Sequence, residues 1–402
     1  MFFIHNIVCF KRIFRSGICC IIIVLLSACV NKQKDNSADI FNRPASIEPM
    51  VDFWKDIYSK WDLDTVLIHD NRYLSVVYEV VKLPQGATEG YTKESREFAK
   101  QQLEAVQLKL IRLEQKLADN ERLNDADKSI ILRLKNAGGA QALIDMSSRV
   151  RSQRGMSSRY KAGLERSYTY LPSFKAAFKD AGLPEDLAYL PHVESSFVNH
   201  AYSSVGASGM WQFMPKTARA YLPMSKSVDG RLDPVFAAKG AARYLGEAQA
   251  RLGSWPLAIT SYNHGVGGMA RAKKEYGANI DTIIKNYDGA RFGFASRNFY
   301  TEFLAARDIA KNPEQYFSKY KQEPVLNLDL IYLESAVKAH DIAAYFNIDI
   351  SLLMQINRSW LPAALTGKTL LPEGLNVWLP KGTLNKNISK TRTFPFSIHK
   401  AQ

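Results

Sequence analysis

The stretch "LPHVESSFVNHAYSSVGASGMWQFMP", residues 190–215, places a single carboxylate, Glu194, among apolar and small side chains. The apolar residues of this neighbourhood are Tyr189, Val193, Phe197, Met210, Trp211 and Phe213. Solvated helix faces seldom carry such a run, and apolar surroundings disfavour the charged form of a carboxyl group. With His192 and His200 nearby, two kinds of site could explain it: a metal site, or a lone catalytic acid in a sugar cleft.

The spacing of the histidines argues against a metal site. His192, Glu194 and His200 follow one another at intervals of two and six residues. Neither interval is the i, i+4 spacing that aims two ligands from one helix face at a zinc ion. His-x-Glu also opens the deaminase signature, but that signature needs a later Cys pair, which this chain lacks. His264 could be a distant third ligand, yet nothing requires it, and we expect neither a metal nor a cofactor.

A catalytic acid fits the residues better. Cleavage of a glycosidic bond needs a general acid that still holds its proton near neutral pH, and burial against apolar groups achieves this. The simpler alternative is a solvated glutamate at a helix end. Most glycosidases use two carboxylates, whereas residues 190–215 contain only Glu194. Asp229 and Asp233, in "DGRLDP", are predicted to form a turn and a helix cap.

Composition limits the class of protein. The chain has 402 residues, 46% of them hydrophobic and 23% charged, which is typical of two or three folded units. Its net charge of +14 suits an anionic partner. We find no compact Lys/Arg block with interleaved aromatic residues, so nucleic acid is not the expected partner.

The first residues have the pattern of an export signal. "MFFIHNIVCFKRIFRSGICCIIIVLLSAC" runs from a basic segment through a short apolar segment to small residues, and it holds all four cysteines. Its end, Leu26 to Cys29, resembles a bacterial lipobox, which implies a signal peptide over residues 1–28 and a lipid on Cys29. Val30, which is not Asp, implies by the same resemblance the periplasmic face of the outer membrane. An uncleaved short anchor is the alternative.

Two regions are expected between this leader and residue 165. Residues 29–50 are polar and without period, which predicts a flexible tether. Residues 51–165 are predicted to be a helical N-terminal region. Asn124 is suited to cap a helix there, and Gly138 with Gly139 to end it. The long helix before it has one apolar stripe, which we expect to pack on a neighbouring helix: Leu103, Val106, Leu110, Leu113 and Leu117.

The rest of the chain divides in three. Residues 166–320 are predicted to be helices with short loops. Residues 321–384 are predicted to form a strand, two short helices and a second strand. That order resembles a LysM module, which binds glycans containing N-acetylglucosamine, although the usual opening turn is missing. Residues 385–402 form a basic tail that we expect to be loosely ordered.

Four motifs occur in order: "ESSF" at 194–197, "GASGMWQFMP" at 206–215, "SYNHG" at 261–265 and "SRNFYTEFLAA" at 296–306. Together they resemble the motifs of the lytic transglycosylases, with wider similarity from "QRGMSSRYKAGLERS" at 153–167 through residue 320. The resemblance implies a mainly α fold with a lysozyme-like catalytic domain of the goose-type or soluble lytic transglycosylase kind. Trp211, where many relatives have methionine, and His264, in place of a small residue, depart from the pattern.

The resemblance also implies roles for single residues. Glu194 corresponds to the catalytic acid. The positions that correspond to residues holding the acid or lining the saccharide site are Ser195, Ser203, Met210, Gln212, Tyr262, Asn263 and Tyr300. Without the resemblance, the simpler interpretation of these side chains is core packing or helix capping.

The implied reaction explains how one carboxylate can suffice. Glu194 would protonate the oxygen between N-acetylmuramic acid and N-acetylglucosamine. It would then take the proton of the muramic 6-hydroxyl, which closes on its own anomeric carbon to give a 1,6-anhydro sugar. Holding both reacting groups in one molecule replaces the second side chain. The partners would be peptidoglycan strands and, through the lipid, the membrane. The alternatives are a water-using muramidase, a non-catalytic peptidoglycan-binding scaffold and a zinc-dependent exported hydrolase.

Overall fold

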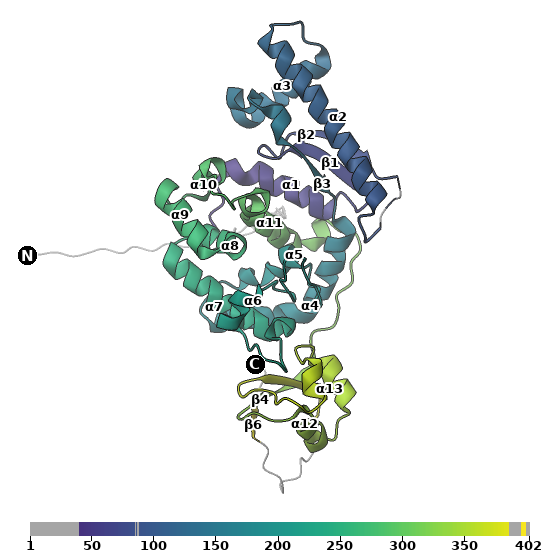
Figure 1. Cartoon of the computed structure of the whole chain (residues 1–402), viewed down its shortest axis with the longest axis vertical. Helices are drawn as coiled ribbons and strands as arrows, with labels where there is room; N and C mark the ends of the chain where they lie inside the picture. Colours follow the sequence, from purple (N-terminus) through teal and green to yellow (C-terminus); the bar gives the residue numbers. More distant parts are fainter. Residues whose placement is uncertain (1–39, 85, 87, 386–394, 399–402) are drawn as a thin grey trace, which may run out of the picture. The chain divides into compact units, whose positions relative to one another are not determined.

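A computed structural model describes residues 40–84, 86, 88–385 and 395–398 (Figure 1). The expected signal peptide, Cys29 and the first part of the expected tether lie outside the described residues. Contacts divide the chain after Ile40, and from Phe41 onward its buried apolar side chains gather in three clusters. In the part of the chain that the structure describes, every helix is too short or too polar to cross a membrane.

Residues 41–50 are folded, so the tether prediction was wrong for them. Phe41 is buried, and its ring lies edge-on to Phe303 with centroids 5.5 Å apart. A short 3-10 helix, η1 (Ala45–Ile47), leads into α1 (Glu48–Ser59). Polar composition suggested a tether, but Phe41, Ile47 and Met50 are buried in the core.

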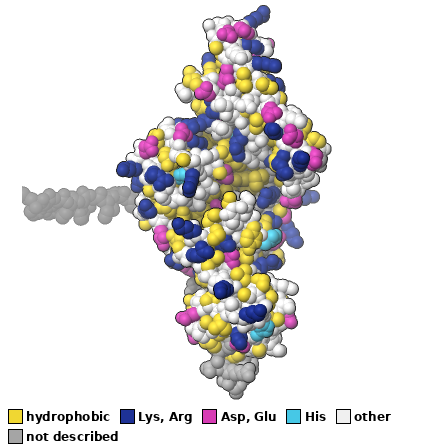
Figure 2. All heavy atoms as spheres, viewed as in Figure 1, with side chains coloured by type: hydrophobic (Ala, Val, Ile, Leu, Met, Phe, Trp, Pro, Cys, Tyr) yellow, Lys and Arg dark blue, Asp and Glu magenta, His cyan; other side chains and the backbone are white. Residues whose placement is uncertain are grey.

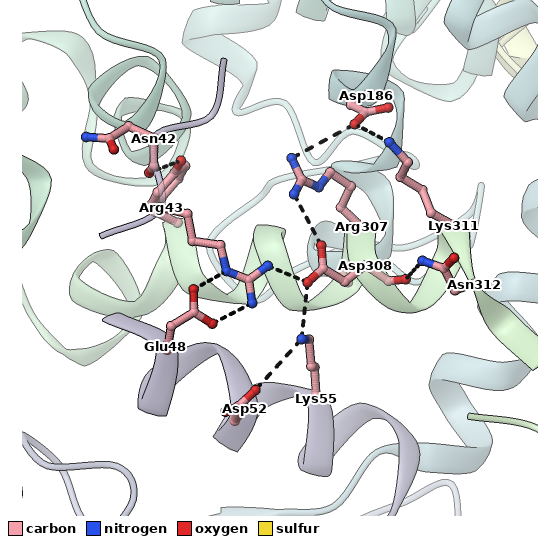
Figure 3. Close-up of polar contacts among 12 residues, drawn as sticks. Asn42, Arg43, Glu48, Asp52, Lys55, Asp186, Arg307, Asp308, Lys311 and Asn312 are labelled. Carbon is pink, nitrogen blue, oxygen red and sulfur yellow. Dashed lines mark hydrogen bonds and ion pairs between the residues drawn. The ribbon is translucent and has the colours of Figure 1, made fainter. Parts of the chain in front are cut away.

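Ion pairs connect this segment to α11 (Phe294–Lys311), a helix distant in sequence, as Figure 3 shows. The Arg43 guanidinium lies 2.5 Å from a Glu48 oxygen and 2.6 Å from an Asp308 oxygen. Lys55 Nζ lies 3.2 Å from Asp308. Since the Arg43 side chain is largely shielded from solvent, these pairs hold α1 against α11 more firmly than exposed ion pairs would.

The region predicted to be helical contains a sheet, which corrects that expectation. The antiparallel strands β1 (Thr65–Asp70), β2 (Val77–Lys82) and β3 (Val150–Arg154) pair in the order β2-β1-β3. β1 is buried along its whole length. β3 is the polar segment "VRSQR", so only its pairing with a strand some eighty residues earlier reveals it.

Helix α2 (Lys93–Ala118) packs on this sheet, and α3 (Asp125–Gly138) contributes to the same buried apolar cluster. The apolar stripe of α2 packs on the sheet and on the 3-10 helix η3 (Met146–Arg149), not mainly on another helix. The cap predictions are confirmed, because Asn124 forms a capping box with Asp127 at the start of α3 and Gly139 follows its end. Another 3-10 helix, η2 (Gly139–Leu143), connects α3 to η3.

Residues 157–311 are mainly helical, as predicted for residues 166–320, but residues 195–214 form a long loop with isolated bridges instead of a short one. Pro191, Pro215 and Pro234 each begin a helix, where the missing N–H leaves no bond unmade. Pro172, by contrast, lies inside a helix. In chain order the elements are α4 (Ser157–Asp180), η4 (Glu185–Tyr189), α5 (Pro191–Glu194), α6 (Pro215–Tyr221), η5 (Gly230–Leu232), α7 (Pro234–Leu252), α8 (Trp255–His264), α9 (Val266–Tyr276), α10 (Ile280–Asn286), α11 and η6 (Pro313–Gln315).

The C-terminal unit contains the predicted strand, two helices and second strand, with an additional one-turn helix before the second strand. It comprises β4 (Leu328–Leu333), α12 (Ala339–Phe346), α13 (Ile350–Ile356), α14 (Pro362–Leu365) and β5 (Asn376–Pro380). A third strand, β6 (Phe396–Ile398), pairs with β4, so the tail is not loosely ordered throughout. The unit contacts the helical region through Trp378, whose indole N–H donates to Asp233 at 3.0 Å. Asp233 caps α7, as the sequence predicted.

Candidate active site

Glu194 is the last residue of α5, and a constrained turn follows it. Ser196 and Phe197 both have positive φ, 51° and 58°, a conformation that costs free energy in non-glycine residues. α4 supports the turn from behind. Arg166 donates to the Ser196 carbonyl at 2.8 Å, and a Cβ on Gly163 would lie 2.8 Å from that carbonyl oxygen. The turn therefore fixes the direction in which the backbone continues after Glu194.

Burial keeps Glu194 protonated. It raises the pKa of the Glu194 carboxyl to about 8, and the nearby charge of Glu302, on α11, is the second cause. The pKa of Glu302 is itself raised to about 8 by burial, against the effect of the Arg151 charge. The two carboxyl groups thus compete for protons as a coupled pair. At neutral pH at least one of them is protonated for most of the time.

Other elements complete the surroundings of this pair. Tyr58 of α1 and Tyr262 of α8 both have pKa values raised by burial and, in addition, by the charge of Glu194. Both are therefore neutral. Figure 2 shows a hollow lined mainly by hydrophobic side chains in the region where Figure 1 labels α5 and α11. The arrangement is that of a general acid in an apolar setting with a second acid beside it.

Two hydrogen bonds, one from Ser195 and one from α8, hold the loop after α5 at the site. Ser195 Oγ donates to the Met210 carbonyl at 2.8 Å, and Tyr262 OH donates to the Trp211 carbonyl at 2.8 Å. Gly209 has φ of 79°, and a Cβ there would lie 1.9 Å from the Arg231 carbonyl oxygen, so only glycine fits. Residues 209–211 therefore connect α5 with α8.

Three more of the residues expected at the site are accounted for by their hydrogen bonds. The Gln212 amide donates to the Ala201 carbonyl at 3.2 Å and closes the loop. Ser203 Oγ accepts from Ala207 N at 2.8 Å, which leaves its hydroxyl proton free to donate. Asn263 is exposed, and its Oδ1 accepts from Ser296 Oγ at 2.7 Å.

Three of the residues expected to hold the acid or line the saccharide site are buried. Tyr300 has no exposed surface, and its hydroxyl donates to the Asn42 carbonyl at 2.8 Å. Met210 is core, with 2% of its surface exposed, and Ser195 is buried and bonded to the backbone. On α11, the charge of Glu302 acts on Glu194.

The sequence contained a signal for Glu302 that was missed. It is the only acid in "SRNFYTEFLAA", an otherwise mostly apolar stretch, as Glu194 is in its own. Tyr58 and Arg151 had no such signal, because they come from the region before the four motifs.

The histidines do not form a metal site around Glu194. His192 is buried, stacked on Tyr160 with centroids 5.0 Å apart, and burial lowers its pKa to about 3, so the ring is neutral. His200 is exposed. Among the residues that the structure describes, His, Cys, Asp and Glu side chains do not gather in groups of three.

Comparisons with known proteins find similarity to the lytic transglycosylases. Residues 172–284 match the family model described as the transglycosylase SLT domain. The chain is 28% identical over 246 residues to the membrane-bound lytic murein transglycosylase D of Escherichia coli K12, covering 59% of this chain and 53% of that protein. It thus spans about half the length of that relative.

Two further matches cover smaller shares of this chain. A "Putative tributyltin chloride resistance protein" of Alteromonas sp. strain M-1 is 34% identical over 163 residues, which are 40% of this chain and 77% of that protein. The solved structure of an inactive mutant of lytic transglycosylase Slt from Pseudomonas aeruginosa aligns at 19% identity with a TM-score of 0.29, covering 54% of this chain and 33% of that one.

Proposed function

This chain belongs to the SLT-domain lytic transglycosylases, with a lysozyme-like domain, and is a distant homologue of membrane-bound lytic murein transglycosylase D; from this we propose that it cleaves peptidoglycan strands with Glu194 as the acid. The observation that supports the proposal most directly is the pKa of Glu194, raised to about 8 by burial. A carboxyl group with this pKa still holds at neutral pH the proton that the bridging oxygen needs.

The reaction uses Glu194 twice. Its proton goes to the oxygen that joins N-acetylmuramic acid to N-acetylglucosamine, and the bond from that oxygen to the muramic anomeric carbon breaks. The resulting carboxylate takes the proton of the muramic 6-hydroxyl as its oxygen bonds to the same carbon. The product is a 1,6-anhydro sugar, and Glu194 is again protonated.

Glu302 acts on this cycle when it is ionised. Its pKa is raised to about 8, so it is mostly protonated at neutral pH and gains charge as the pH rises. Once ionised, it disfavours a second negative charge on Glu194, so the proton stays on the catalytic acid.

The presence of Glu302 supports one alternative, a muramidase that uses water. In such an enzyme Glu302 would be the base or the nucleophile that pairs with the acid. The two reactions differ in their products, since only the hydrolase leaves a reducing muramic acid.

The remaining expectations extend the same proposal. The C-terminal unit, with its strand–helix–helix–strand order, would bind glycan as a LysM-like module. Export and a lipid on Cys29 would hold the protein at the periplasmic face of the outer membrane, close to its substrate.

Mass spectrometry of the soluble products tests the reaction. Purified peptidoglycan is digested with the full-length protein in detergent and with its Glu194→Gln variant. Glu185→Gln, at an exposed position, is the matched control. Products lighter by one water than the hydrolysis products, absent only with Glu194→Gln, are expected. Reducing muramic acid would establish the muramidase, and no product from any of the proteins would refute both.

A further inference from the structure

A cavity of about 550 Å³ lies beside the end of α8, in a part of the chain that the cleavage reaction does not use. It is formed by the end of α8, the first half of α9 and the loop between α10 and α11. The residues that line it are His264, Gly268, Arg271, Tyr287, Gly289, Ala290 and Arg291. Below it is called the arginine pocket.

Three rings make a rigid base for the arginine pocket. His264 lies edge-on to Phe292, with centroids 5.0 Å apart, and edge-on to Tyr287 at 6.0 Å. Two glycines make room for these rings. A Cβ on Gly268 would lie 2.4 Å from the His264 ring, and a Cβ on Gly289 would lie 2.3 Å from the Tyr287 hydroxyl. Substituting either glycine would displace a wall, so the pocket depends on both.

The charge of the arginine pocket is positive and is not neutralised within the described structure. Arg271 and Arg291 are exposed, and neither makes an ion pair with a described residue. Burial lowers the pKa of His264, a hydrogen bond with the Arg291 backbone raises it, and the charges of Arg271 and Arg291 both lower it. The nearby Asp288 carboxylate is engaged elsewhere, since Arg297 donates to it at 2.8 Å. Figure 2 shows lysine and arginine side chains on the face that carries α9 and α10.

Two neighbouring residues at the start of α11 contact Asn263 and the loop of the arginine pocket. Ser296 Oγ donates to Asn263 Oδ1 at 2.7 Å. The next residue, Arg297, donates to the Tyr287 carbonyl at 3.2 Å and so fixes the pocket loop. His264, which follows Asn263 directly, is part of the pocket wall. A polymer bound along Asn263 therefore passes next to two unpaired guanidinium groups.

We propose that the arginine pocket binds a carboxylate of the peptide that peptidoglycan strands carry on their muramic acid residues. This rests on the proposed function for its substrate, but not on the chemistry at Glu194. Two guanidinium groups suit carboxylates, because their planar donors form paired hydrogen bonds with both oxygens. Rings and backbone at glycine positions let a peptide approach closely. His264, which departs from the family pattern, then has a role as a wall of this subsite.

Calorimetric titration with a peptide tests the proposal without any cleavage. The probe is L-alanyl-γ-D-glutamyl-meso-diaminopimelate, added to the full-length protein in detergent. Arg271→Gln and Arg291→Gln should each weaken binding about tenfold or more, because each removes charge-assisted hydrogen bonds. Lys274→Gln, an exposed change on α9 with the same loss of charge, should bind as the unchanged protein does. The same peptide with amidated carboxyl groups should not bind.

Other outcomes would overturn the proposal. The proposal is refuted if the peptide does not bind the unchanged protein, or if the arginine variants bind it as tightly as the unchanged protein does. Displacement of the peptide by inorganic phosphate, where acetate at the same concentration has no effect, would assign the pocket to a phosphate group instead. Peptide binding in a protein that releases no anhydro products would refute the proposed reaction and leave the pocket standing. Release of anhydro products without peptide binding would support the proposed reaction and refute the proposal for the pocket.

Discussion

Replacing Glu302 by Gln should move the alkaline limit of activity to lower pH. The catalytic form of Glu194 is protonated, so activity is present below its pKa and is lost as pH rises through it. Burial and the Glu302 charge together raise that pKa from 4.5 to about 8, and burial is the larger cause. Less than half of the rise thus belongs to Glu302. Its removal should lower the midpoint of the alkaline limb by about one pH unit, equivalent to about 1.4 kcal/mol.

The assay is the rate of release of soluble fragments from purified peptidoglycan between about pH 5 and pH 9. The Glu185→Gln variant, changed at an exposed site, should keep the original limb. An unmoved limb in Glu302→Gln would refute the electrostatic coupling between the two carboxyl groups. Loss of activity at every pH in a folded variant would instead give Glu302 a direct part in the chemistry, as a muramidase requires.

Three further predictions concern stability. Glu194→Gln should raise the free energy of unfolding by about 1–3 kcal/mol at pH 7 and leave it unchanged below about pH 4. The reason is that a carboxyl group whose pKa is raised on folding destabilises the fold increasingly as pH rises from its unfolded pKa to its folded pKa. Thermal melts at both pH values check this, and a gain in stability that persists in acid would contradict it. Arg43→Met should cost about 1–3 kcal/mol, since it leaves the Asp308 carboxylate without its closest partner; equal urea midpoints would show that the network contributes nothing. Trp378→Phe should cost about 1–3 kcal/mol by removing the donor to Asp233, and an unchanged urea midpoint would count against this contact.

Local patterns were enough to predict much of this protein. The mainly helical character of residues 166–320 was predicted, and several of the prolines there lie at helix starts. The Asn124 cap and the strand–helix–helix–strand order of the C-terminal unit were also predicted, since each depends on neighbours within a few turns of chain. The surroundings of Glu194 in sequence indicated an acid in an apolar environment, and its raised pKa agrees.

Tertiary structure alone decided which residues meet. The sheet pairs β1 with β3, a polar strand some eighty residues later, so no local pattern reveals it. Tyr300 and Glu302 lie two positions apart on α11, which turns their side chains about 200° apart. Packing of α11 on α1 and α5 buries Tyr300 and brings Glu302 to Glu194. The sequence by itself determined the acid and the helices around it, whereas its charged partner depended on how one helix is rotated against the others.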